Sequence, residues 1–353
     1  VMGLPGLKKI REHKAINRRI DAWMAEHPVA VHVPVDSPAA NFPICAMARR
    51  RGVRIVHLVA PQIWAWGTWR IRKLRRLTDL VLCILPFEEG WFNTHGVPAR
   101  FIGHPLFDET PRPADLLAHG AGLPDGTPRI ALLPGSRPGE LARNFPLLLR
   151  SFRALKAARP GLSGVVAATT PAVEQRLRAM AEEHGGWPDG LEMASGATDA
   201  IIHWCDLAIV VSGTVTLQIA RQRRPMVIVY TSNRIGYHLL ARWLLTTKFF
   251  ALPNLIAGRE IVPEFIPHFG GHEAIVERVA SILDDERAIE DQRAALDRVV
   301  EKFQGFNAAR AAADAIEEMA DLSRRDRGAE EPDRDPPVPT SVGDRYPLDQ
   351  GSV

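Results

Sequence analysis

Short apolar runs alternate along the chain with longer segments in which apolar positions recur at helical spacing. A continuous apolar run bounded by turn residues is typical of a buried parallel strand, and the helical period is typical of an amphipathic helix. Strands are predicted at 29–36, 54–60, 79–87 and 99–105, and again at 130–133, 163–168, 207–211 and 225–230. Helices are predicted between the early strands and then at 141–157, 172–184, 214–223, 236–246, 272–284, 286–303 and 307–321.

This alternation predicts an α/β fold with two Rossmann-like lobes, each built on a doubly wound parallel sheet. A chain of 353 residues is long enough for two such cores. Prolines concentrate in 106–128, which we expect to be the connection between the lobes. We therefore expect a first lobe at 1–105, a second lobe with closing C-terminal helices at 129–322, and a disordered tail rich in Pro and Asp at 323–353.

The first predicted helix, within Val1–Trp23, is amphipathic and basic. Its apolar positions are interleaved with lysines and arginines; they are Leu7, Ile10, Ile16, Ile20 and Trp23. Such a helix suits an anionic membrane surface, and the alternative is an ordinary surface helix that packs on its own lobe. A basic run at 70–76 is predicted as a solvated helix face, with a membrane surface as its second interpretation.

Composition narrows the class of protein. The net charge is only +3, which gives no global case for a nucleic-acid partner. The three cysteines, Cys45, Cys83 and Cys205, show neither a CxxC pair nor metal-ligand spacing, so we expect a reducing compartment and no metal site. No apolar run approaches the roughly 18–20 residues that a membrane-spanning helix needs.

The loop after the first strand of the second series, in "IALLPGSRPGEL" (130–141), is a candidate anion site. Gly135 and Gly139 let backbone approach a ligand closely, Ser136 adds a hydroxyl, and Arg137 adds a planar, permanently charged guanidinium at the start of a helix. The alternative is a tight strand-to-helix turn with a surface arginine.

A second loop of the same kind lies in "LAIVVSGTVTLQIA" (207–220), where Ser212, Gly213 and Thr214 separate an apolar strand from a helix. Ordinary capping of that helix is the alternative. Two such loops in one lobe favour a nucleotide diphosphate. Neither matches the P-loop or the GxGxxG pattern, which disfavours ATP hydrolysis and dinucleotide redox chemistry.

Six motifs, in their order and spacing, resemble lipid-A-disaccharide synthases. They are "PQIWAW", "LPFE", "FIGHP", "LLPGSR", "SGT" and "LPNLIAGRE". The resemblance implies an inverting glycosyltransferase of the GT-B arrangement that needs no metal or cofactor. It implies transfer from UDP-2,3-diacylglucosamine to 2,3-diacylglucosamine 1-phosphate (lipid X) through a β-1,6 bond, with release of UDP, for lipid A biosynthesis. It also implies a cytoplasmic enzyme, peripheral on the inner membrane of a Gram-negative-type bacterium.

The resemblance carries over residue by residue. Asp36, in "VDSPAANF", matches the family's proposed catalytic aspartate and would take the proton of the acceptor hydroxyl; a strand-end cap is the alternative. Arg137 matches the essential arginine that holds the leaving diphosphate, beside Gly135 and Ser136. The remaining residues matched to UDP binding are Ser212, Gly213, Thr214, Gln218, Asn254, Arg259 and Glu260.

Two residues are weaker candidates for the cleft between the lobes. Trp66, like Trp64 in the same "WAW" motif, could stack on sugar, although aromatic side chains are more often core. His104 could contact substrate or be a structural inter-lobe histidine, and Glu88 could cap the helix that follows "LPF".

The chain departs from the family pattern at three places. The family begins further upstream with a strand and a Gly-rich loop, so we expect a first lobe that is incomplete at its N-terminus. Ala39 stands where the family has a second aspartate, and Gln218 stands where it has a glutamate that holds the UDP ribose. A Gln can still bind hydroxyls, without charge assistance, so we expect weaker UDP binding.

Two alternatives to this function stay open at the level of sequence. One is another GT-B enzyme for UDP-sugars, similar to UDP-N-acetylglucosamine 2-epimerase. The other is a protein that binds UDP or membranes and has lost catalysis. A homo-oligomer is a candidate assembly for this protein.

Overall fold

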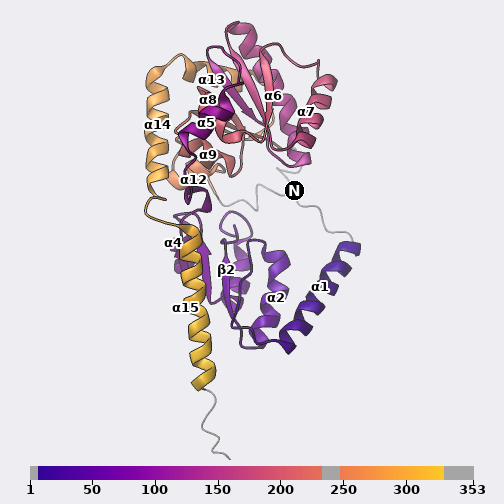
Figure 1. Cartoon of the computed structure of the whole chain (residues 1–353), viewed down its shortest axis with the longest axis vertical. Coiled ribbons are helices and arrows are strands. Elements are labelled where there is room, and N and C mark those ends of the chain that lie inside the picture. The colour runs from indigo at the N-terminus through magenta and orange to yellow at the C-terminus, as the bar shows by residue number, and fades with distance from the viewer. Residues whose placement is uncertain (1–6, 233–246, 330–353) are drawn as a thin grey trace, which may run out of the picture.

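The computed structural model describes residues 7–232 and 247–329 of the chain. Two lobes lie one above the other along the long axis, each with a parallel sheet between helices (Figure 1). The predicted α/β fold with two Rossmann-like lobes is confirmed. The predicted helix at 236–246 lies outside the described residues.

The first lobe contains a four-stranded parallel sheet in the order β1-β2-β3-β4. Its strands are β1 (Val31–His32), β2 (Arg54–Leu58), β3 (Leu80–Cys83) and β4 (Ala99–Phe101). Its helices are α1 (Leu7–Glu26), α2 (Pro38–Arg50), α3 (Ile71–Leu77) and α4 (Glu88–Thr94), with a 3₁₀ turn η1 at Thr68–Arg70.

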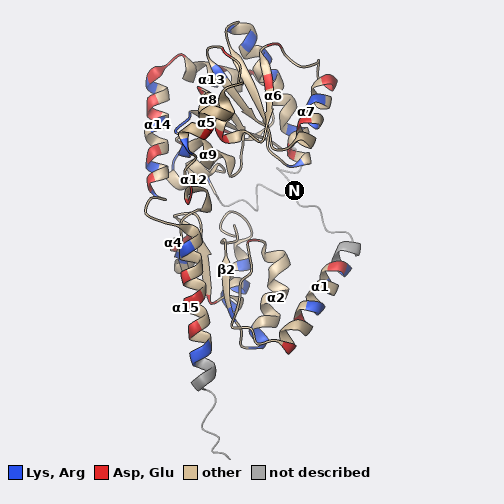
Figure 2. Cartoon of the chain, viewed as in Figure 1, with Lys and Arg blue, Asp and Glu red and all other residues tan. Residues whose placement is uncertain are grey.

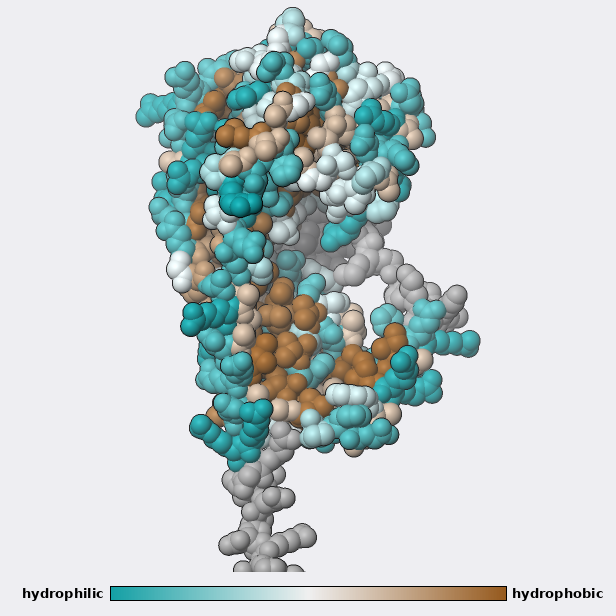
Figure 3. Space-filling view, viewed as in Figure 1, coloured by the Kyte–Doolittle hydropathy of each residue, from teal (hydrophilic) through white to brown (hydrophobic). Residues whose placement is uncertain are grey.

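β1 is much shorter than the predicted strand at 29–36. Only Val31 and His32 pair in the ladder, and an isolated bridge joins Val35 to Leu58. Pro34 lies between these pairs and has no N–H to donate, and Asp36 leaves the extended conformation with φ of 51°. Figure 3 shows apolar side chains gathered on the face of this lobe between α15 (Ala308–Ala329) and α1.

The second lobe contains a six-stranded parallel sheet in the order β10-β9-β8-β5-β6-β7. Its strands are β5 (Arg129–Leu133), β6 (Ser163–Ala168), β7 (Leu191–Ser195), β8 (Leu207–Val211), β9 (Met226–Thr231) and β10 (Glu264–His268). Its helices are α5 (Pro113–Gly120), α6 (Pro138–Ala158), α7 (Pro171–Glu183), α8 (Thr198–Trp204), α9 (Val215–Arg221), α12 (Leu252–Ala257), α13 (Glu273–Leu283) and α14 (Glu286–Glu301).

The second sheet is buried on both faces. One face packs its apolar side chains against α6, α7 and α13, and the other packs against α8, α9 and α14. The central strands are therefore continuous apolar runs, which is why their sequences predict them well.

The described chain passes between the lobes twice, and aromatic side chains pack where the two segments meet. Phe107, in the 3₁₀ turn η2 (Pro105–Phe107), stacks on Phe303 with ring centroids 4.3 Å apart. Gly103 has φ of 85°, and a Cβ there would lie 2.6 Å from the Cβ of Phe306. This close approach requires a residue without a side chain at position 103.

α15 was expected to close the second lobe, and it packs instead against the sheet of the first. Its Ala312 and Ala315 are buried against Val56, Leu80 and Leu82. The small alanine side chains let the helix lie close to the strands. The helix also continues to Ala329, so the part of the predicted disordered tail from 323 to 329 is helical.

None of the described helices is long and apolar enough to cross a bilayer. Lys, Arg, Asp and Glu residues recur along α1, α14 and α15 (Figure 2).

Candidate active site

The strand order of the second sheet places one ligand site by topology. The chain builds β5, β6 and β7 outward in one direction and then returns to place β8 on the other side of β5. Ligands of open α/β sheets bind at such a switch point, outside the carboxyl ends of the strands. Here the loops that follow β5 and β8 meet at that point.

A cavity of about 250 Å³ lies between these two loops. Its walls contain every residue predicted for the two loops except Gly139, together with Gln218 from α9; the predicted members are Gly135, Ser136, Arg137, Ser212, Gly213, Thr214 and Gln218. Thr169 and Thr198 add hydroxyls that the sequence did not single out. The lining therefore combines one cation, several hydroxyls and glycine backbone.

Gly135 is required by the conformation of its loop. Its φ is 94°, in the left-handed region, and a Cβ there would lie 3.2 Å from Oε2 of Glu140. Any other residue would bring strain and crowd the Glu140 carboxylate. The glycine thus allows Glu140, from the first turn of α6, to line the cavity.

Arg137 is the N-cap residue of α6, and its side chain is 81% exposed. Its Nη1 donates a hydrogen bond of 2.7 Å to Oε1 of Glu140. This carboxylate raises the pKa of Arg137, so the guanidinium stays cationic. Glu140 is a residue that sequence reasoning missed, although its place three residues after Arg137 on a helix was a usable signal.

A second cavity, of about 320 Å³, joins the same loops to the first lobe. Arg137, Ser212, Gly213 and Thr214 line it on one side, and Gln62, Trp64 and Ala65 line it on the other. Thr247, Phe250, Leu252 and Leu255 complete its walls. The two loops therefore face a cleft between the lobes.

Trp64, rather than the predicted Trp66, contributes to this inter-lobe cavity. Trp66 is partly exposed and lies under the guanidinium of Arg70, whose Cζ is 3.9 Å from the ring centroid. Trp64 is buried, and its Nε1 donates a hydrogen bond of 2.9 Å to Oε1 of Glu88. Burial raises the pKa of Glu88 to about 7.

Asp36 lies at the carboxyl ends of the first-lobe strands. Its backbone N–H donates to the carbonyl of Leu58, and its carbonyl is 2.8 Å from Nε2 of buried His57. Its side chain is exposed, and within the described part of the chain it lines neither of the two cavities above. The structure thus places Asp36 in the opposing lobe but not in contact with the Arg137 loop.

His104 is mostly buried at the crossing between the lobes. Its Nδ1 accepts a hydrogen bond of 3.1 Å from the backbone N–H of Leu106, and its ring lies edge-on to Phe107 and Phe303. Burial lowers its pKa. These contacts match the structural alternative for this histidine.

Asn254 is fully buried and holds two backbone segments together. Its Oδ1 accepts from the N–H groups of Ile261 and Val262, and its Nδ2 donates to the carbonyl of Val262 and to Glu264. Every hydrogen-bonding group of the side chain is engaged within the protein. Asn254 shapes the connection from α12 to β10.

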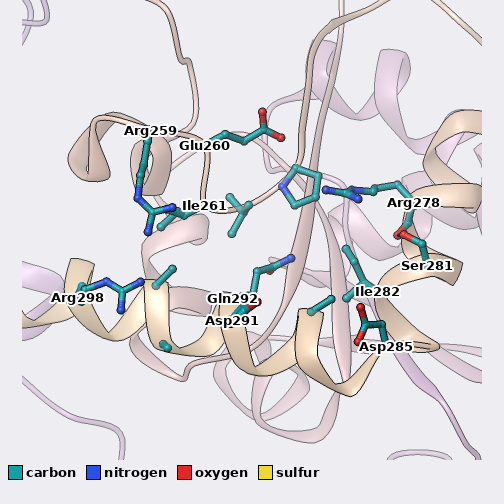
Figure 4. Close-up of a pocket in the computed structure, with 15 residues that line it drawn as sticks. Arg259, Glu260, Ile261, Arg278, Ser281, Ile282, Asp285, Asp291, Gln292 and Arg298 are labelled. Carbon is teal, nitrogen blue, oxygen red and sulfur yellow. The ribbon is translucent and has the colours of Figure 1, made fainter.

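Arg259 and Glu260 are separated from the Arg137 loop. They line a groove of about 940 Å³ on the outer side of the second lobe, beside α13 and α14. Figure 4 shows Arg259 pointing toward Arg298 of α14, with Glu260 pointing away from both. Six of the predicted site residues thus line neither of the two cavities beside the Arg137 loop; they are Asp36, Trp66, His104, Asn254, Arg259 and Glu260.

The described residues contain no group of three or more His, Cys, Asp or Glu side chains placed to hold a metal ion. All three cysteines are buried, and burial raises the pKa of each thiol. The polar groups of the site are instead an arginine paired with the Glu140 carboxylate, hydroxyls and amides, which suit binding of a charged, hydroxylated ligand.

Comparisons with known proteins agree with this arrangement. A family model described as lipid-A-disaccharide synthetase matches residues 1–319. The lipid-A-disaccharide synthase of Anaeromyxobacter sp. (strain K) is 38% identical over 303 residues, which cover 85% of this chain and 78% of that protein. The enzyme of Pseudomonas aeruginosa (strain UCBPP-PA14) is 35% identical over 288 residues, covering 81% and 75% of the two chains.

Solved structures show the same fold at low identity. The structure of S. aureus MnaA with UDP aligns with a TM-score of 0.55 at 12% identity, covering 84% of this chain and 81% of that one. The family itself is shown by the sequence matches, which span most of both chains. The chain therefore belongs to the lipid-A-disaccharide synthase family.

Proposed function

We propose that this lipid-A-disaccharide synthase binds the UDP of its donor, UDP-2,3-diacylglucosamine, in the cavity between the β5 and β8 loops. The acceptor, 2,3-diacylglucosamine 1-phosphate, binds on the first-lobe side of the adjoining cavity. The observation that carries this proposal is that both candidate phosphate loops, 76 residues apart at Ser136 and Ser212, line one cavity at the switch point of the sheet.

In the proposed reaction, Arg137 receives the negative charge that develops on the leaving UDP. A preorganised cation at the site of developing charge stabilises the transition state more than the ground state. Glu140 holds the guanidinium at the start of α6, and the helix N-terminus adds positive potential. The S. aureus MnaA structure, which has a similar fold and was solved with UDP, supports a uridine nucleotide as the ligand.

Asp36 is the proposed general base, which takes the proton of the acceptor hydroxyl as that oxygen attacks the donor sugar. A sugar hydroxyl is a weak nucleophile until its proton is removed. The exposed carboxylate of Asp36 and its place at the strand ends of the opposing lobe support this role. The hydrogen bond between His57 and the Asp36 carbonyl keeps the backbone of Asp36 in place.

Calorimetric titration with UDP tests the nucleotide site. We expect wild-type protein to bind UDP and Arg137→Ala to bind it at least about tenfold more weakly, because a charge-assisted hydrogen bond is lost. Arg150→Ala, at an exposed position further along α6, is the matched control and should bind as wild type does. Wild-type protein that binds no UDP would overturn the proposal.

We also propose that the first lobe rests on the membrane that supplies both lipid substrates. α1 exposes Ile16 (49%) and Trp23 (52%), one apolar and one aromatic side chain, beside the exposed Arg18 and Arg19. Trp69, next to the basic helix α3, is also exposed. Exposed apolar side chains among cations are the features that bind an interfacial helix to anionic lipid.

Co-sedimentation with anionic liposomes tests this membrane proposal. Binding should occur at low salt, weaken at high salt, and fall in the variant Arg18→Glu/Arg19→Glu. The control Arg176→Glu/Arg287→Glu, with two exposed arginines of the second lobe, should sediment as wild type does. Absence of sedimentation at low salt would refute membrane contact and leave the UDP site unaffected.

A further inference from the structure

Glu88, the first residue of α4, lies directly behind the first-lobe wall of the inter-lobe cavity. Its side chain is buried, and each of its two oxygens has separate partners. Oε2 accepts hydrogen bonds from the backbone N–H groups of Ile84 (3.2 Å) and Leu85 (3.0 Å), while Oε1 accepts from Nε1 of Trp64 (2.9 Å). One oxygen therefore serves the local turn and the other serves the tryptophan.

The turn alone does not explain a glutamate at this position. Small residues such as Ser or Asp serve backbone N–H groups at helix starts without burying a long carboxylate. Burial of a carboxyl group costs free energy, which is reflected in the pKa of Glu88, raised to about 7. The buried Glu88 carboxylate also makes a contact with Trp64, which the shorter side chain of a Ser or Asp would not reach.

Trp64 is held on two sides. Its indole N–H is fixed by Glu88, and its ring meets Phe87 edge-on, with centroids 4.8 Å apart and planes at 88°. Trp64 lines the cavity together with Gln62 and Ala65, across from Arg137 and the β8 loop. Trp64 is 6% exposed, so it presents only a small, rigidly held part of its apolar ring to the cavity, which suits contact with the apolar face of a sugar ring.

We infer that Trp64 is the platform for the sugar ring of the acceptor and that Glu88 is a positioning residue that fixes this platform. The inference rests on the proposed function, because it takes the second-lobe side of the cavity to hold UDP. Trp64 would contact the ring, and Glu88 would act only through Trp64.

Glu88→Gln changes the contact with Trp64 while it keeps the size of the side chain. The single carbonyl oxygen of a glutamine can serve the two backbone N–H groups, which leaves its NH₂ facing the N–H of Trp64. Two donors cannot bond to each other, so the indole has to move. Trp64→Phe removes the same contact from the other side and keeps an aromatic ring.

Steady-state kinetics of the full-length chain, with the concentrations of donor and acceptor varied separately, test the inference. Each single variant should raise the KM for the acceptor about tenfold, and UDP affinity by calorimetry should stay within about twofold of wild type. Because Glu88 acts through Trp64, the double variant should be no worse than either single variant.

Glu89→Gln is the matched control. Glu89 is the next residue of α4, and its Oε2 accepts from the backbone N–H of Phe101 in β4, away from Trp64. It should leave the acceptor KM unchanged. If Glu88→Gln does not fold, Trp64→Phe alone still decides whether the platform exists.

The inference is overturned if either single variant keeps the wild-type acceptor KM, or if their effects simply add in the double variant. It is also overturned if UDP affinity falls along with the rise in acceptor KM, which would indicate general damage to the cleft. If the variants fail in one of these ways while wild-type protein still binds UDP and turns over substrate, the inference about Trp64 is wrong and the proposed function stands. If wild-type protein itself binds no UDP, the proposed function is wrong.

Discussion

At the scale of single residues, Arg137 of the second lobe and Asp36 of the first, the two proposed catalytic residues, are held in different ways. Arg137 is hydrogen-bonded to Glu140, and the loop requires a residue without a side chain at Gly135. Asp36, in contrast, is fixed within residues 7–232 and 247–329 through its backbone, by Leu58 and His57. Its exposed carboxylate is therefore free to adjust to a bound acceptor.

Substitution of the proposed base gives the clearest prediction at this scale. Asp36→Asn should lower kcat by about 10²–10⁴-fold, because the acceptor hydroxyl then loses its proton acceptor. UDP affinity should not change, since Asp36 lies in the other lobe. Measurement of UDP release with both lipid substrates checks this, with Asp189→Asn as the control at an exposed second-lobe position. Near-wild-type kcat would exclude Asp36 as the base.

Gln218 gives a prediction in the opposite direction. It lines the cavity proposed for UDP from α9, at a position where the sequence resemblance implies a glutamate. Gln218→Glu should strengthen UDP binding by roughly three- to tenfold, because a carboxylate accepts a stronger hydrogen bond from a ribose hydroxyl than an amide does. Calorimetry measures the change. Weaker binding in the variant would show that repulsion from the diphosphate or from Glu140 outweighs the ribose contact.

At the scale of elements, the sequence predicts those strands that are buried on both faces. β5, β6, β8 and β9 were found close to their true bounds because each is a continuous apolar run. β7 and β10 were missed: both are edge strands, "LEMAS" and "EFIPH", in which polar residues or a proline interrupt the run. α5, α8 and α12 are too short to show a helical period.

The same distinction applies to the site. The two loops proposed to bind phosphate could be located from the sequence because each is a continuous stretch that follows a recognisable strand. The opposing wall of Gln62, Trp64 and Ala65 depends on how the lobes face each other, which no local pattern encodes. Arg259 and Glu260 belong to a recognisable motif, but the path of the chain after α12 carries them to the outer groove.

The ends of β1 and β2 give a prediction about pH. Burial lowers the pKa of both His32 and His57, and their proximity lowers that of His32 further. Nε2 of His32 and Nδ1 of His57 are buried without a hydrogen-bond partner within the described chain. Protonation of either ring would bury an unpaired charge.

The sign follows from proton uptake. Histidines of the unfolded chain titrate near pH 6.5, so below that pH the unfolded state binds protons that the folded state rejects, and the free energy of unfolding falls. His57→Gln keeps a donor near Nε2 but does not titrate. Its stability should fall less steeply between about pH 6.5 and 5, by up to about 1.4 kcal/mol per pH unit.

Urea unfolding from pH 5 to 8 measures this slope. Glu88 has the opposite sign, because its raised pKa makes the fold less stable as the pH rises from about 4.5 to about 7. That contribution is the same in wild type and variant, and it cancels in the difference. His119→Gln, on the exposed face of α5, is the control, and equal slopes for wild type and His57→Gln would contradict the prediction.

At the scale of the whole molecule, the two lobes share one apolar core at the crossing. Leu217, Ile256, Val299 and Phe303 of the second half are buried in the same cluster as the first-lobe strands. Asp108 adds a polar link, because its carboxylate accepts from the N–H groups of Ala308 and Ala309 at the start of α15. The lobes are thus joined by packing as well as by the chain.

α9 links the β8 loop, at residues 212–214, to the inter-lobe segment around Leu106 and Glu109. The helix begins directly after Thr214 and ends at Arg221, whose guanidinium donates to the carbonyls of Leu106 (2.6 Å) and Glu109 (2.9 Å) and to the carboxylate of Asp199. A helix of seven residues is about 10 Å long and does not bend easily. We therefore expect a displacement of the loop to reach the segment that joins the lobes.

UDP binding at the N-terminal end of α9 should then be measurable at the segment beyond its C-terminal end. Saturation with UDP should slow amide hydrogen exchange in 105–109 as well as in 212–214, and Arg221→Gln should abolish the distant part of that protection while it keeps the near part. Equal exchange in 105–109 with and without nucleotide would mean that loop and crossing move independently. Through Arg221, binding of the donor would make the inter-lobe segment 105–109 more rigid before any acceptor is bound.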